Sequence, residues 1–484
     1  MHNEISIKIM TRHTDIASLP IPSSRFYDRG KFGRFFPWLP PCIKDEESSL
    51  DLLALADLMK GGRDDSRMPA GYTYLGQFII HDISFDPTSI NERQVDPDYL
   101  WNFRTPALDL DSLYGGGPFV TPFLYEATNQ SIPFLMGNKW ELENLPDRYK
   151  IPRTKAGIAI ISDPRNDENA IISQLHATFL MLHNEMLKRV DGGNRMEKFF
   201  LARRETTWLY QWVILKDYLP RIVDKVLVED ILENGRKYYD WHNEPFIPLE
   251  FSAAAFRFGH AQVKPLYTFN NDNDNLAVSV FIEPKDAPRI NWKSFFFLQE
   301  QGVRPNFNRQ LGPFLTELLN DLPESVLNNP ELPSEAPDEE PKRKNALWAS
   351  ILDCKMKVNE KHLAARNLFR GTMLKLPSGQ GVARAMKKKG DNQIEVFDIP
   401  DIPEKLKSNT PLWYWILYEA QQKGMGEKLG PVGARIVAEV IIGLLEGDKT
   451  SFLNQDPNWI PRDKEGKPKE EFNMIDLLEL AGVY

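Results

Sequence analysis

The sequence has few cysteines and no long apolar run. Its 484 residues include two cysteines, Cys42 and Cys354, which excludes a disulfide scaffold or a thiolate metal cluster and predicts two buried free thiols. No stretch approaches the 18 uninterrupted apolar residues of a membrane span. The amino-terminal stretch MHNEISIKIMTRHTD lacks the apolar core and cleavage site of a signal peptide. We therefore expect no membrane span and cytoplasmic residence by default, while export without a cleaved signal stays open.

A strong basic block is also missing. The net charge is −9, and the basic runs are short, for example residues 387–389. We therefore expect no nucleic-acid partner. A hydrophobic content of 42% with 26% charged residues is typical of a soluble globular protein. The length allows two or three ordinary domains or one large helical enzyme body.

The pattern along the chain favours the single helical body. Residues 1–70, with the stretch SRFYDRGKFGRFFPWLPP, are rich in proline and aromatics and predict an arm that wraps a catalytic domain over 71–484. Residues 330–344 are acidic and proline-rich and predict a mobile loop. The fold class is mainly α, with few short strands and long irregular connections. Apolar spacings of three and four predict helices over 71–83, 165–190, 200–232, 251–263, 310–327, 358–374 and 431–446.

There are only eight histidines, and His81, in GQFIIHDISFDP, is the first candidate for chemistry. On the predicted helix 71–83, Gln77 lies one turn earlier on the same face. Asp82 is rotated by roughly 100° and faces elsewhere. A buried structural histidine is the alternative, so the interpretation depends on partners elsewhere in the chain.

The stretch RTPALDLDSLYGGGP offers oxygen ligands. Thr105, Ala107, Asp109 and Asp111 alternate, so in an extended loop they would point to one side. Carboxylates, a hydroxyl and a backbone carbonyl suit a hard cation such as Ca²⁺. A solvated turn is the alternative, and the metal site gains support if Asp82 joins it.

A helix start with unusual charge follows in SDPRNDENAIISQLHATFLMLHNEM. Asp163 is a plausible N-cap, but Arg165 falls in the first turn, where the helix dipole disfavours a cation. Such a local violation hints at function, and Glu168 shares its face. His176 and His183 are seven residues apart without a third metal ligand, and we interpret both as structural.

Two further stretches carry candidate binding residues. His260, in FSAAAFRFGHAQV, follows a run of small residues at 253–255 that would let a flat ligand approach the backbone, although tight helix packing would need the same residues. Arg257 lies one turn before it. In HLAARNLFRG, Asn367 and Arg370 are one turn apart, a spacing that a solvated helix face would also show.

Together these groups suit haem chemistry. A haem iron needs an axial nitrogen ligand, and peroxide activation needs a base on the opposite side. A histidine with an unperturbed pKa near ~6.5 can be that base. A fixed cation stabilises the developing charge, and haem propionates need guanidinium partners.

The motifs GQFIIHDISFDP, LDLDSLYGGGP, SDPRNDE with LHATFLMLHNEM, AFRFGH and RNLFRG occur in the order seen in animal-type haem peroxidases. The sequence resembles a bacterial member of this peroxidase–cyclooxygenase superfamily, related to myeloperoxidase and lactoperoxidase, over nearly the whole chain. The resemblance implies roles at the haem for eight residues. They are His81 as distal acid–base, Arg165 as distal cation, Gln77 in the distal pocket, His260 as iron ligand, Asn367 as acceptor from its imidazole, Arg257 and Arg370 as propionate partners, and Glu168 as an ester-forming position. It also implies a calcium site of Asp82, Thr105, the Ala107 carbonyl, Asp109 and Asp111.

Departures from the family pattern narrow the expectation. Ile80 stands where mammalian members have an ester-forming aspartate, and Asn169 where myeloperoxidase has a methionine. We therefore expect haem b, bound non-covalently or by one ester through Glu168, together with Ca²⁺. Arg257 stands where cyclooxygenases and fatty-acid dioxygenases have a radical-forming tyrosine, which argues against dioxygenase chemistry.

The resemblance thus implies a haem peroxidase. Hydrogen peroxide would form a ferryl intermediate that oxidises small phenolic or aromatic donors, or halides. A fatty-acid dioxygenase or a hydroperoxide-rearranging haem enzyme of the same superfamily is the alternative, and a non-enzymatic haem-binding protein is third. The reducing substrate and the oligomeric state stay open.

Overall fold

The structure is a computed structural model. It describes residues 30, 32–44, 48–62, 64–86, 100–137, 150–241, 244–270, 277–296, 303–323 and 361–483. The predicted loop at 330–344, Cys354 and the first 29 residues of the predicted arm lie outside this part of the chain. The proposed division at residue 70 stays a prediction.

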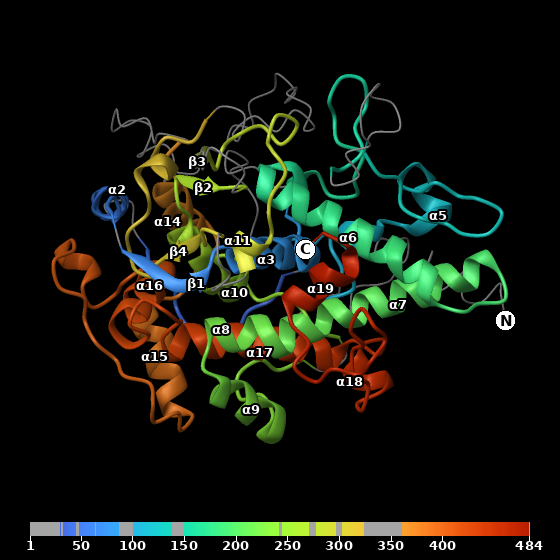
Figure 1. Cartoon of the computed structure of the whole chain (residues 1–484). Helices are drawn as coiled ribbons and strands as arrows, with labels where there is room; N and C mark the ends of the chain where they lie inside the picture. Colours follow the sequence, from blue (N-terminus) through green and yellow to red (C-terminus); the bar gives the residue numbers. More distant parts are fainter. Residues whose placement is uncertain are drawn as a thin grey trace, which may run out of the picture.

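Helices dominate the described chain, as the sequence predicts (Figure 1). The α-helices are α2 (Ser48–Leu58), α3 (Gly71–Ile83), α4 (Asp111–Tyr114), α5 (Gly117–Val120), α6 (Ala170–Arg189), α7 (Arg195–Val213), α8 (Leu219–Ile222), α9 (Lys225–Asn234), α10 (Leu249–Ser252), α11 (Lys293–Phe296), α14 (Leu363–Met373), α15 (Gly379–Lys388), α16 (Leu412–Lys423), α17 (Pro431–Gly447), α18 (Phe452–Gln455) and α19 (Met474–Ala481). The 3-10 helices are η3 (Pro122–Leu124), η4 (Pro164–Asp167), η6 (Ala255–Gln262), η7 (Glu317–Asn320) and η8 (Glu404–Leu406), and η5 (Ile214–Tyr218) is a π-helical turn.

The strands form two small antiparallel pairs beside the helices. β1 (Asp65–Pro69) pairs with β4 (Phe307–Arg309), and β2 (Leu266–Thr268) pairs with β3 (Ala277–Ser279). All four strands lie on the left of the view in Figure 1. They are short, which matches the few strand signals of the sequence.

The core is built on α17, which is buried along most of its length. Its stretch VAEVIIGLL is apolar apart from the buried Glu439, and a helix with so little polar face is stable only inside a core. Helices α9, α10, α15, α16 and α18 pack against it, and α6 packs against α3, α7 and α19. One connected cluster of buried apolar side chains joins all these elements.

Helix α3 begins at Gly71 without a side-chain cap, so burial rather than capping stabilises it. Gly76 is required in its middle, because a Cβ there would lie 2.5 Å from the Tyr218 hydroxyl. Ten of its 13 residues are buried. The half-buried exceptions are Thr73, Gln77 and Ile80, spaced by four and three, so they share one face. This face borders the candidate site.

The predicted helices 71–83 and 431–446 are confirmed in place as α3 and α17. Of the predicted helix 358–374, residues 358–360 lie outside the described part of the chain, and the rest is α14 from Leu363 onwards. The predicted helix 165–190 is η4 followed by α6, and 200–232 is α7, η5, α8 and most of α9. The predicted continuous helix over 251–263 is wrong, because Ala254 leaves the helical conformation and η6 is a tighter 3-10 helix. The prediction for 310–327 is also wrong: Pro313 and Pro323 interrupt the pattern, and of residues 310–323 only Glu317–Asn320 are helical. None of the described helices is long and apolar enough to cross a membrane.

Candidate functional site

His81 lies on the last turn of α3 and is buried. Its Nδ1 is 2.9 Å from the side-chain oxygen of Asn166 in η4. Burial lowers the pKa of His81 to about 3, and the nearby Arg165 guanidinium adds to this effect. The imidazole is therefore neutral at physiological pH and able to accept a proton.

Arg165 is held beside His81 by a buried carboxylate. Its Nε and Nη2 donate to Asp163 at 3.0 and 2.7 Å, and its Nη2 also donates to the His81 carbonyl at 2.8 Å. Asp163 also accepts from Arg104 at 3.1 and 2.6 Å. The two guanidiniums hold the pKa of Asp163 well below its usual range despite burial. Asp163 caps η4, as predicted, by accepting from the Arg165 backbone N–H, which offsets the unfavourable position of that cation.

Gln77 and Glu168 meet on the exposed face of α3. The Gln77 amide nitrogen donates to Glu168 at 3.3 Å, and its oxygen accepts from Asn169 at 3.2 Å. Asn169 in turn caps α6 through its side-chain oxygen. Glu168 is exposed, yet desolvation raises its pKa to about 7, with Arg165 opposing the shift. The Glu168 side chain is therefore accessible to solvent although protein surrounds much of it.

His260 lies in η6 and belongs to the second half of the candidate site. Asn367 of α14 holds it, with 2.8 Å between Nδ2 and the imidazole Nδ1. The Asn367 oxygen accepts from Arg257 at 2.7 Å. Burial, Arg257 and Arg366 together lower the pKa of His260 to about 3. The expected contact is present, but the amide presents its nitrogen rather than its oxygen to the imidazole.

Arg257 and Arg366 lie near His260, and Arg370 lies near Arg257. Burial lowers the pKa of Arg257 to about 10, and the positive charges of Arg370 and Arg366 contribute, while Asp86 acts in the opposite direction. Arg370 donates to Asp86. Because like charges close together in a desolvated place are unfavourable, this cluster is suited to bind an anion.

The two halves of the site lie close together. The Thr73 hydroxyl of α3 donates to Gln262 of η6 at 3.1 Å, and a Cβ on Gly259 would lie 3.9 Å from the Thr73 methyl group. The charge of Arg366 acts on both Glu168 and His260. We use the name recess for the region bordered by Gln77, Glu168, Arg257, His260 and Arg366; Glu168 is exposed, and the other four are intermediate in burial.

The acidic loop contacts the reverse face of α3. Asp82 is fully buried and accepts from the backbone N–H groups of Leu110 and Ser112 at 3.1 and 3.2 Å. These bonds hold Leu110 in the left-handed region at φ 58°, which is unusual for a leucine. Burial and the neighbouring Asp111 raise the pKa of both Asp82 and Asp109. The three carboxylates are therefore near one another.

The predicted extended geometry of this loop is wrong. Residues 104–109 bend repeatedly, and Asp111 begins helix α4. Ala107 and Asp111 are buried, whereas Thr105 and Asp109 are half-buried. Asp111 is paired with Arg104 at 3.4 Å. In the described part of the chain no three His, Cys, Asp or Glu side chains converge to hold a metal ion, so the structure does not confirm the calcium site.

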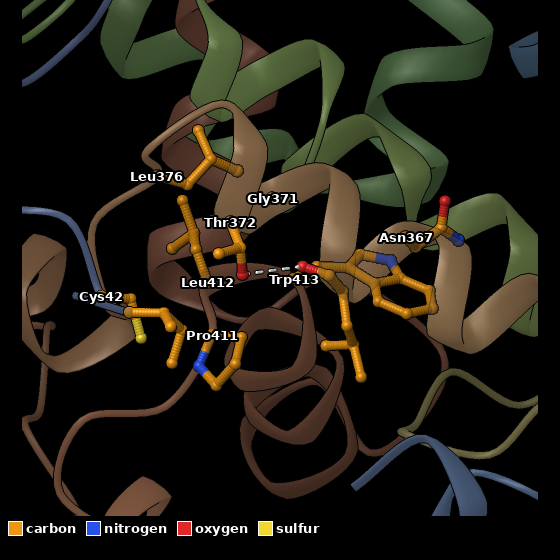
Figure 2. A pocket seen from close by; sticks show the side chains of 10 residues that line it. Cys42, Asn367, Gly371, Thr372, Leu376, Pro411, Leu412 and Trp413 are labelled. Atoms are coloured by element: carbon orange, nitrogen blue, oxygen red, sulfur yellow. Dashed lines mark hydrogen bonds between the residues drawn. The ribbon is translucent and has the colours of Figure 1, made fainter. Parts of the chain in front are cut away.

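A small cavity lies next to Asn367. It measures about 10 Å³ and is lined by α14, by the start of α16 and by Cys42. Figure 2 shows Asn367 and Cys42 at opposite ends of the group of lining side chains, with Trp413 beside Asn367. Cys42 is a buried free thiol, as predicted, and burial raises its pKa to about 12. The cavity is too small for a cofactor and is distinct from the recess.

The comparison with protein families agrees with this arrangement. Residues 96–333 match the family described as animal haem peroxidase, a range that includes Arg165, Glu168 and His260. The matched range is just under half of the chain, which over this range is similar to animal haem peroxidases. Thyroid peroxidase of Mus musculus is 26% identical over 243 residues, which are 44% of this chain and 25% of that protein. Heme peroxidase 2 of Caenorhabditis elegans is 28% identical over 109 residues, 21% of this chain and 15% of that protein. The chain thus spans about a quarter or less of these curated relatives.

Solved structures share the fold over most of the chain. Peroxidase A from Dictyostelium discoideum matches with a TM-score of 0.58 and 15% identity, covering 88% of this chain and 89% of that chain. Oryza sativa fatty acid alpha-dioxygenase matches with a TM-score of 0.57 and 13% identity, covering 98% and 88%. At such identities the likeness shows a common fold.

The sequence missed several residues of the site. Asn166, Arg104 and Arg366 were not singled out, and Asp163 was assigned only as a cap. Arg104 binds Asp163, 59 residues away, and Asn166 contacts His81, 85 residues away. Arg366 acts on His260, which is also distant in the sequence, so helical spacing could not connect these residues. The surplus of arginines in HLAARNLFRG was the one available signal for Arg366.

Proposed function

We propose that this chain is a haem peroxidase that uses hydrogen peroxide to oxidise small phenolic or aromatic donors. One observation carries the proposal: a neutral imidazole, His81, is held beside a fixed guanidinium, Arg165. A haem carrier needs no such pair. A peroxidase needs both a proton acceptor and a fixed positive charge.

Haem is the cofactor that the similarity to this family implies, and the residues of the recess fit it. The crowded guanidiniums of Arg257, Arg366 and Arg370 suit a ligand with two carboxylates. His260 is neutral and supplies a ligand nitrogen. When bound, the haem supplies the iron on which the peroxide O–O bond is cleaved and the oxidising equivalents are stored.

The distal residues move the proton and stabilise the charge. His81 Nε2 accepts the proton of hydrogen peroxide and returns it to the departing oxygen. Arg165 is oriented by Asp163 and stabilises the negative charge that develops on that oxygen. Gln77 offers its amide on the same face of α3, where a halide or water would be held.

The proximal residues orient the iron ligand. For His260 to offer Nε2 to a metal, its ring proton must reside on Nδ1. The Asn367 oxygen must then accept from His260, in addition to or in place of the bond from Arg257. An amide oxygen has two lone pairs and can serve both donors.

Two further roles follow from the resemblance. Glu168 borders the recess, and its raised pKa of about 7 favours a neutral carboxyl group, so we propose haem b bound non-covalently or through one ester at this residue. We also propose Ca²⁺ near Asp82 and Asp109, supported by burial and by the charge of Asp111, which raise the pKa of both carboxyl groups. That fit is incomplete, because donors of Leu110 and Ser112 already engage Asp82, and no catalytic step is routed through the ion.

A fatty-acid dioxygenase is the second candidate, because solved alpha-dioxygenases share the fold over 98% of this chain. Arg257 argues against it. It stands where the resemblance places a radical-forming tyrosine, and it is bonded to Asn367. Oxygen uptake with a fatty acid, compared with peroxide-dependent oxidation of a phenol, distinguishes the two activities.

The decisive experiment is stopped-flow absorption of the haem-loaded chain mixed with one equivalent of hydrogen peroxide. We expect a rapid change of the Soret band in the wild type, and a rate about 10²–10⁴ lower in His81→Gln. His183→Gln is the matched control, because His183 is also buried and neutral but is bonded to Tyr114. A haem spectrum that does not respond to peroxide, or equal rates in wild type and His81→Gln, would overturn the proposal.

A further inference from the structure

Asn166 joins two buried histidines. Its side-chain oxygen is 2.9 Å from His81 Nδ1, and its side-chain nitrogen is 3.0 Å from His176 Nδ1. Asn166 and His176 have no exposed surface, and His81 is almost entirely buried. The three residues come from η4, α6 and α3, so the contact exists only in the folded chain.

The amide determines where each ring proton resides. Its oxygen can only accept and its nitrogen can only donate. Both rings are buried, and a neutral imidazole carries one ring proton. His81 therefore carries its proton on Nδ1 and has a lone pair on Nε2. His176 accepts at Nδ1 and carries its proton on Nε2.

His176 is otherwise difficult to explain. Its Nε2 is buried without a hydrogen-bond partner among the described residues, and its ring lies edge-on to Phe78 with centroids 6.2 Å apart. An unpaired buried N–H is unfavourable, and an apolar side chain would avoid it. Orienting the Asn166 amide is a function that an apolar residue could not perform.

We propose that Asn166 and His176 are positioning residues that hold His81 in the tautomer whose Nε2 can accept a proton. The role of His81 as a base rests on the proposed function, whereas the position of its ring proton does not. A reversed amide would donate to His81 Nδ1 and place the ring proton on Nε2. That form cannot take a proton from peroxide.

The tautomer can be read without any activity. Nitrogen-15 NMR of the full chain labelled at its histidine rings distinguishes a protonated from a bare Nδ1, and loss of signals in His81→Gln assigns the resonances. The chain is measured as purified and, where it carries haem, in its reduced carbon monoxide adduct, which is diamagnetic. We expect His81 protonated on Nδ1 in the wild type, and the Nε2–H form to become substantial in His176→Leu and in Asn166→Leu.

Asn166→Asp keeps an acceptor for His81 Nδ1 but cannot donate to His176. We expect it to retain the wild-type tautomer and a peroxide rate within about tenfold of wild type. The peroxide rate should fall at least about tenfold in Asn166→Leu and in His176→Leu, because a histidine with its proton on Nε2 cannot act as the base. His183→Gln again serves as the control.

The outcomes separate the two proposals. A His81 protonated on Nε2 in the wild type, or an unchanged tautomer and rate in Asn166→Leu and His176→Leu, would overturn the positioning role. If Asn166→Leu does not fold, the His176→Leu spectrum and rate decide. An Nδ1–H tautomer in a chain that ignores peroxide would support the positioning role and refute the peroxidase.

Discussion

Replacing Asp163 by asparagine should destabilise the chain and disable the distal site together. Asp163 has no exposed side-chain surface and is paired with Arg104 and Arg165, whose side chains are 10% and 17% exposed. The substitution preserves the shape of the side chain but removes the carboxylate that the two nearly buried guanidiniums share, and it leaves Arg104 paired with Asp111 at 3.4 Å. Removing one partner of a buried ion pair costs about 3–5 kcal/mol, so we expect a loss of that size at pH 7.

The pH dependence of this loss follows from the pKa of Asp163, which is held well below its usual range. A carboxyl group with a depressed folded-state pKa contributes stability that is present above its unfolded pKa, near ~3.9. The contribution is lost as the pH falls towards the folded-state pKa. The difference in the free energy of unfolding between wild type and Asp163→Asn should therefore be constant at neutral pH. It should become smaller as the pH falls below about 4.

The assay is urea unfolding followed by tryptophan fluorescence, with the peroxide reaction measured in parallel. Asp167→Asn is the matched control. Asp167 lies in the same 3-10 helix and binds Arg153 at 2.7 and 2.6 Å, but it does not contact Arg165. We expect it to lose less stability and to keep the peroxide rate. Exposed ion pairs contribute less than about 1 kcal/mol. If Asp163→Asn lowers the free energy of unfolding by no more than this, the reasoning is refuted.

Four further predictions concern the site and the core. Because the pKa of His81 is about 3, its neutral form is complete above that value, so the peroxide rate should be flat from about pH 5 to 8; a fall on acidification centred near ~6.5 would contradict this. His260→Ala should abolish the normal Soret band after haem loading, and a normal band would show that another residue ligates the iron. Asp109→Ala should lower both the melting temperature and the bound calcium in elemental analysis, and undiminished calcium would exclude that role. Gly379→Ala should cost about 1–3 kcal/mol in urea unfolding, because the added Cβ would lie 2.1 Å from Trp415; unchanged stability would show that the ring shifts freely.

The sequence predicted the fold class and the strongly periodic helices, because α3 and α17 bury apolar stripes that spacing reveals. It failed where local geometry departs from an ideal helix. Residues 251–263 have a helical spacing, but Ala254 breaks the helix, and no spacing rule reports a single dihedral angle. The network around Asp163 was predicted in part. Its role as a cap was visible within one turn, whereas Arg104, which donates to Asp163, comes from a loop 59 residues earlier in the chain.

The arginine cluster has a consequence for how the protein is produced. Arg257, Arg366 and Arg370 oppose one another in the folded chain, and unfolding separates them. A dianionic ligand that binds only the folded chain removes this repulsion and shifts the folding equilibrium by mass action. Haem supply during expression should therefore govern the yield of soluble protein, and a chain made under haem limitation should be more sensitive to proteolysis than the same chain made with haem in excess.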